Sequence, residues 1–175
     1  MKDTRKMTMA GLCVALALVL PFLTGQIPDI GGMLCPMHIP VLLCGLLCGW
    51  PWGLAVGAVS PILRSLFFNM PPLFPTATAM AFELAAYGVT AGVMVTLLPK
   101  KRRYLYVALI TAMIVGRMVW GIVMWIIMGA TGGSFTWAAF VAGALTNAIP
   151  GIILHVAIIP LITMRIAPVF AERRA

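Results

Sequence analysis

The sequence predicts an all-α integral membrane protein, a bundle of six transmembrane helices with both termini in the cytoplasm. Hydrophobic residues make up 62% of the 175-residue chain and charged residues only 9%, whereas charged residues form about a quarter of an ordinary globular chain. The mean hydropathy is +1.07, and the apolar residues come in repeated long runs. These observations exclude a water-soluble domain and indicate the membrane class.

The apolar runs divide a single membrane domain, residues 1–175, into six segments. They are 7–23, 37–50, 53–69, 76–98, 104–129 and 137–164. The second is shorter than the roughly 20 residues that a helix needs to cross the hydrocarbon, so we expect residues 33–36 to extend it or its neighbours to cover it. A cleaved signal peptide is the alternative for residues 1–24, although the small-residue cleavage site is poor.

The basic residues set the predicted orientation. Ten of the twelve Lys and Arg residues flank apolar runs, at the N-terminus, in "PKKRR" (99–103) and near the C-terminus. With a cytoplasmic N-terminus these groups all fall inside, and the outer loops 24–37, 69–75 and 129–135 carry no Lys or Arg. This is the positive-inside pattern of a membrane protein, which explains the formal charge of +8 without nucleic acid.

Three residues that are charged at neutral pH lie inside the predicted spans, namely Arg64, Glu83 and Arg117, although a charge at bilayer depth is costly unless it faces a cavity or a partner. Counting about 1.5 Å of rise per residue from the outer ends of the segments brings five polar residues into the outer half of the membrane: His38, Arg64, Glu83, Arg117 and Asn147. Tyr87 follows Glu83 by one turn on the same face. The count places His155 deeper, nearer the cytoplasm, and leaves it out. We therefore expect an outward-facing substrate pocket formed by these six residues.

The charges admit more than one interpretation. Two arginines against one carboxylate leave a surplus positive charge that an anionic ligand would neutralise, and arginine binds carboxylates through two parallel hydrogen bonds. Alternatively, Arg64 and Glu83 form a structural ion pair, or Arg64 extends to the outer interface.

The chain shows no catalytic or metal-binding motif. Walker A, H-E-x-x-H and G-x-S-x-G patterns are all missing, so we expect no enzyme, no metal and no cofactor in this chain. The four cysteines are expected to be small apolar packing residues; they are Cys13, Cys35, Cys44 and Cys48.

Three stretches together resemble a known family. They are "GQIPDIGGMLCPMHIPVLLCGLLCGWPWGLAVGAVSPILRSL" (25–66), "AMAFELAAYGVTAG" (79–92) and "GALTNAIPGIILHVAIIPLI" (143–162), preceded by a basic N-terminus and a first helix rich in small residues. Across nearly the whole chain they resemble the substrate-binding membrane subunit (S component) of energy-coupling factor (ECF) transporters, the vitamin importers of prokaryotes.

The resemblance implies a six-helix bundle in a prokaryotic cell membrane, with the loop 24–37 capping an outward pocket. It implies a complex with a membrane coupling subunit and two cytoplasmic ATPases, which use ATP while the S component topples in the membrane. Helix one would dock to the coupling subunit through Gly11, Ala15 and Ala17, although the strict A-x-x-x-A form is absent. Among the family's cargoes the surplus positive charge favours pantothenate, with riboflavin, folate, a B6 vitamer, niacin or a deazapurine precursor as alternatives.

Two other classes of function stay open on the sequence. A membrane scaffold of the cell envelope would bind no solute, and its charges would only hold helices together. An intramembrane enzyme is a third class, for which the catalytic residues are missing.

Overall fold

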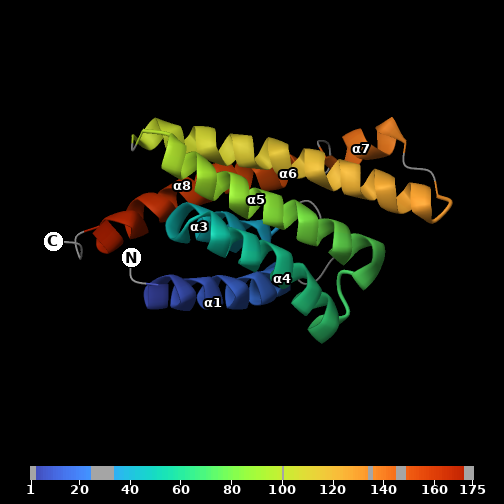
Figure 1. Ribbon diagram of the computed structural model, residues 1–175, viewed down its shortest axis with the longest axis horizontal. Coiled ribbons are helices and arrows are strands. Elements are labelled where there is room, and N and C mark those ends of the chain that lie inside the picture. The colour runs from blue at the N-terminus through green and yellow to red at the C-terminus, as the bar shows by residue number, and fades with distance from the viewer. Residues whose placement is uncertain (1–2, 25–33, 100, 134–135, 145–148, 172–175) are drawn as a thin grey trace.

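The computed structural model describes residues 3–24, 34–99, 101–133, 136–144 and 149–171, and there is no β-strand among them. Helix α1 (Asp3–Val19) continues into a 3-10 turn, η1 (Leu20–Thr24). After it come α3 (His38–Cys48), α4 (Trp50–Phe68), the π-helical turn η2 (Leu73–Ala77), α5 (Thr78–Leu97), α6 (Arg102–Ala130), α7 (Trp137–Ala144) and α8 (Ile149–Ala171). Figure 1 shows these helices packed lengthwise into one bundle.

Five of the described helical segments are long and apolar enough to cross a membrane. They are Asp3–Leu23, Trp50–Phe68, Leu73–Leu97, Arg102–Ala130 and Ile149–Ile166. An all-helical, multi-pass membrane protein is therefore confirmed, while the count of six spans stays a prediction. The start of α1 and the end of α8 lie at the same end of the bundle (Figure 1), as expected if both termini are on one side of the membrane.

Helix α3 is the short second segment, and its neighbours enclose it. Nine of its eleven residues are buried, and it contacts α1, α4, α5 and α8. Because protein rather than lipid surrounds it, α3 does not need the length of a full span. Gly49 ends the helix at φ 98°, a conformation that glycine adopts without steric cost, and α4 starts at the next residue.

Glycines let α3, α4 and α5 pack backbone to backbone. A Cβ on Gly88 of α5 would overlap the carbonyl of Gly53 on α4, and a Cβ on Gly57 would overlap the carbonyl of Leu84. A Cβ on Gly45 of α3 would in turn overlap the carbonyl of Gly88. Gly53 and Gly57 lie four residues apart on one face of α4, the small-x-x-x-small spacing that lets helices associate closely in lipid.

The predicted sixth segment, 137–164, contains two described helices. Helix α7 lies against the second half of α6 (Figure 1), where the ring of Phe140 occupies the space that a Cβ on Gly121 would need. Helix α8 is described over Ile149–Ala171 and packs against α3 and α6.

Candidate functional site

Glu83 is the centre of a buried polar cluster. It lies on α5 and is 1% exposed. Arg117 of α6 places Nη1 3.0 Å from Glu83 Oε1, and His38, the first residue of α3, places Nε2 3.4 Å from the same oxygen. One carboxylate oxygen thus joins three helices that are far apart in sequence.

Aromatic rings form one wall of this cluster. The ring of His38 stands edge-on to that of Tyr87, with centroids 5.0 Å apart, and lies nearly parallel to that of His155 at 5.8 Å. Tyr87 fits because residue 116 is glycine: a Cβ there would lie 2.9 Å from the Tyr87 ring. Gly116 therefore lets α6 approach α5 at the residue before Arg117.

Cys35 connects the segment before α3 to α6 and α8. Its thiol accepts a hydrogen bond from Arg117 Nη2 at 3.5 Å, and its backbone carbonyl accepts one from His155 Nε2 at 3.2 Å. Burial raises the pKa of the Cys35 thiol, and the nearby Arg117 guanidinium opposes part of that effect. The thiol is accordingly neutral at physiological pH and a weak hydrogen-bond acceptor.

Two buried nitrogen atoms of the cluster have no hydrogen-bond partner within the described residues. They are His38 Nδ1 and Arg117 Nε. An unpaired buried polar group costs about 1–3 kcal/mol, so these two atoms are the places where a ligand would be stabilised most.

The structure brings together four of the six predicted site residues, namely His38, Glu83, Tyr87 and Arg117. Asn147 lies outside the described residues. Sequence reasoning missed Cys35, which was assigned to packing, and His155, whose depth was counted along one helix from residue 137. His155 lies on α8 with its ring stacked on that of His38 at 5.8 Å, a proximity that depends on how α8 packs against α3 and that depth along the sequence does not give.

Arg64 lies away from the cluster. Its Nη1 donates to the backbone carbonyl of Leu18, and its Cζ lies 4.9 Å from the ring centroid of Phe22 and 5.4 Å from that of Phe68. Where α1 tightens into η1, a 3-10 bond to the Leu18 carbonyl would come from residue 21, which is a proline without an N–H. The hydrogen bond from Arg64 to that carbonyl joins α4 to α1.

The alternative of an Arg64–Glu83 ion pair is therefore wrong, since among the described residues Glu83 pairs with Arg117 and His38. The expectation that Arg64 helps to form the pocket also does not match its position. It rested on similar depth in the membrane, and depth does not fix which way a side chain points around its helix.

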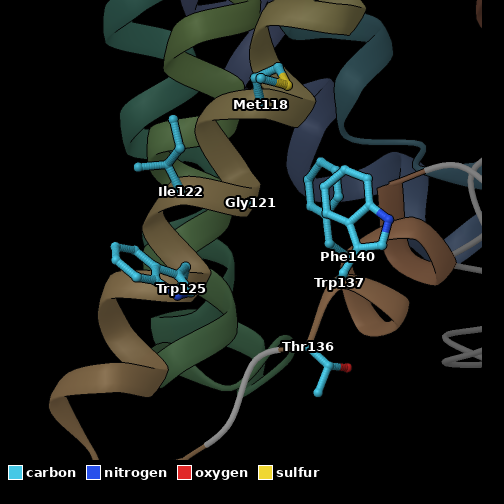
Figure 2. Close-up of a pocket in the computed structure, with 7 residues that line it drawn as sticks. All are labelled: Met118, Gly121, Ile122, Trp125, Thr136, Trp137 and Phe140. Carbon is cyan, nitrogen blue, oxygen red and sulfur yellow. The ribbon is translucent and has the colours of Figure 1, made fainter.

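An apolar cavity of about 390 Å³ lies between α6 and α7. Figure 2 shows Met118, Ile122 and Trp125 on α6, with Trp137 and Phe140 on α7. Gly121 and Thr136 complete the lining. None of the cluster residues lines this cavity, and a charged ligand would find no charged side chain in it.

The chain matches the family described as ECF transporter, substrate-specific component, over residues 5–163. The chain belongs to this family. Comparisons with curated proteins and with solved structures gave no match. As an S component, the protein is a substrate-specific subunit of a membrane transporter, and the buried polar cluster lies in the matched region.

The small residues predicted for docking this S component face different directions. Gly11 and Ala15 are exposed on α1, and a Cβ on Gly11 would meet no atom within 4 Å. Ala17 is fully buried in the bundle. It therefore cannot belong to the same outward face, because two positions from Ala15 is about 200° around a helix.

Proposed function

We propose that this S component captures a small anionic vitamin, with pantothenate favoured, in an outward-facing site and passes it into the cell of a prokaryote. A membrane coupling subunit and two ATPases supply the energy from ATP. The single observation that carries the proposal is the buried Arg117–Glu83–His38 cluster, assembled from three helices in a chain of the substrate-specific family.

The free-energy cost of burying this cluster favours a ligand site over an ion pair that only holds helices together. Burying ions is expensive, and apolar residues of similar volume often hold helices together as well or better. A purely structural ion pair would also satisfy its own polar atoms, yet His38 Nδ1 and Arg117 Nε have no partner among the described residues. A ligand that accepts hydrogen bonds from these atoms recovers part of the free energy lost when they are buried without partners.

An anion is favoured by the donor capacity of Arg117 rather than by a surplus of charge. With Arg64 elsewhere, the charges of Arg117 and Glu83 cancel. Arg117 nevertheless pairs with Glu83 through Nη1 alone, and its Nη2 donates to the neutral sulfur of Cys35. A carboxylate is a far stronger acceptor for guanidinium N–H groups than a thiol, and pantothenate carries one.

The exposed face of α1 around Gly11 and Ala15 is the proposed contact with the coupling subunit. Both residues are small and uncovered, so another helix can approach α1 closely there. Ala17 is not included, since α3 and α4 cover the inner face of α1.

The proposed function is tested by vitamin uptake. The chain is expressed with an ECF coupling subunit and ATPases in a bacterium that can neither make nor import pantothenate. We expect growth on limiting pantothenate and uptake of labelled pantothenate, both lost when the ATPases cannot hydrolyse ATP. Parallel strains test niacin, B6 and folate. Absence of chain-dependent uptake of any vitamin in an assembled complex would contradict the proposal and favour the scaffold.

A further inference from the structure

The guanidinium of Arg117 is used unevenly. Its Nη1 pairs with Glu83 Oε1 at 3.0 Å, its Nη2 contacts the Cys35 thiol at 3.5 Å, and its Nε is buried without a partner among the described residues. The strong bond lies on one side of the group, and the weak contact and the unpaired atom lie on the other.

The unpaired Nε and the weakly bonded Nη2 lie on the same edge of the Arg117 guanidinium. In a guanidinium, Nε–H and one Nη2–H point in parallel, and this pair matches the two oxygens of a carboxylate. A neutral sulfur accepts hydrogen bonds weakly and cannot bridge both donors. The Nε–Nη2 edge of Arg117 is therefore shaped for a carboxylate that none of the described residues provides.

We infer that the Cys35 thiol occupies the place of a substrate carboxylate, and that the bound substrate displaces it from the Nε–Nη2 edge of Arg117. The inference rests on the proposed function and identifies the substrate as a carboxylate. It also assigns Cys35 a role in setting affinity, because the thiol competes with the substrate for Nη2.

Displacement requires only the side chain of Cys35 to move. The backbone carbonyl of Cys35 has its own bond to His155 Nε2 at 3.2 Å, so the segment stays attached to α8 while the thiol leaves. Cys35 has φ 46°, a left-handed conformation that Asp and Asn adopt more readily than most residues. Position 35 therefore accepts a matched pair of substitutions.

The test compares Cys35→Asp with Cys35→Asn in the full-length, detergent-purified protein. The aspartate places a carboxylate beside Arg117 and blocks the edge internally, whereas the asparagine has nearly the same shape without the charge. We expect the Cys35→Asp variant to bind pantothenate at least about 100-fold more weakly than the Cys35→Asn variant. The melting temperature without ligand should be at least as high for Cys35→Asp as for Cys35→Asn, which shows that the aspartate is folded against Arg117.

A second measurement compares substrates that carry a carboxylate with analogues that lack it. Wild-type protein is titrated with pantothenate and its alcohol pantothenol, and with nicotinate and nicotinamide, and we expect binding of one acid with its uncharged analogue at least about 100-fold weaker. Equal affinity for acid and analogue, or equal affinity of the two Cys35 variants, would overturn the inference while the proposed function stands. If the wild type binds neither these acids nor any other vitamin, the proposed function fails as well.

Discussion

Arg117 of α6 and Glu83 of α5 form a buried ion pair, with Nη1 3.0 Å from Oε1. His38 reaches the same oxygen from α3. Charges that look isolated along the sequence thus form one network in space. Arg117 belongs to this network and Arg64 does not, so the two arginines have different roles.

Removing one member of the pair should destabilise the bundle more than removing both. We expect Arg117→Ala to lower the free energy of unfolding by about 3–5 kcal/mol, because it leaves the Glu83 charge buried without its partner. The double variant Arg117→Met, Glu83→Leu should recover much of that loss. Thermal and denaturant unfolding in detergent measures both, and a double variant as unstable as the sum of the two single variants would contradict the pairing.

Arg64 should matter for stability but not for ligand binding. Arg64→Ala removes the hydrogen bond to the Leu18 carbonyl and the contacts with Phe22 and Phe68, so the melting temperature should fall by several degrees. Affinity for the vitamin should stay within about threefold of wild type, because Arg64 lies away from the polar cluster and distant sites act independently. A large loss of affinity in folded Arg64→Ala protein would return Arg64 to the binding site.

The sequence predicts much of the fold for physical reasons. Hydrophobic length and the placement of Lys and Arg define helices and their ends. Burial of the short α3 was one of two expected alternatives, and the structure selects it.

The sequence predicts the site less well, because a polar residue in a span has a depth but no visible direction. Glu83 and Tyr87 are one turn apart on one helix, so their proximity was predictable. The choice of Arg117 rather than Arg64 as the partner of Glu83 depends on helix rotation and packing. His155 was missed because counting depth from residue 137 does not show how α8 packs against α3.

The contact between α4 and α5 should not tolerate a methyl group. Gly88→Ala would force its Cβ into the carbonyl of Gly53, and overpacking of this kind costs about 1–3 kcal/mol or more. Gly11→Ala, which meets open space, is the matched control and should unfold like the wild type. Comparable stability of the two variants would show that α4 and α5 are less closely packed than described.

The exposed face of α1 should govern assembly with the coupling subunit. Gly11→Leu and Ala15→Leu should abolish co-purification with that subunit while leaving vitamin binding unchanged, because a large side chain prevents close helix approach. Gly129→Leu, at another glycine with no atom within 4 Å of its Cβ position, is the control and should still assemble. Normal co-purification of both α1 variants would place the docking surface elsewhere.

The most direct test of the central claim is the melting temperature of the purified protein against a panel of vitamins, with Arg117→Lys measured alongside. A ligand that binds only the folded state raises the melting temperature, and lysine keeps the charge of Arg117 but loses its paired donors. We predict that one carboxylate vitamin, pantothenate first, stabilises the wild type and not Arg117→Lys. Equal stabilisation of both proteins, or none by any vitamin in well-folded wild-type protein, would contradict a carboxylate site at Arg117.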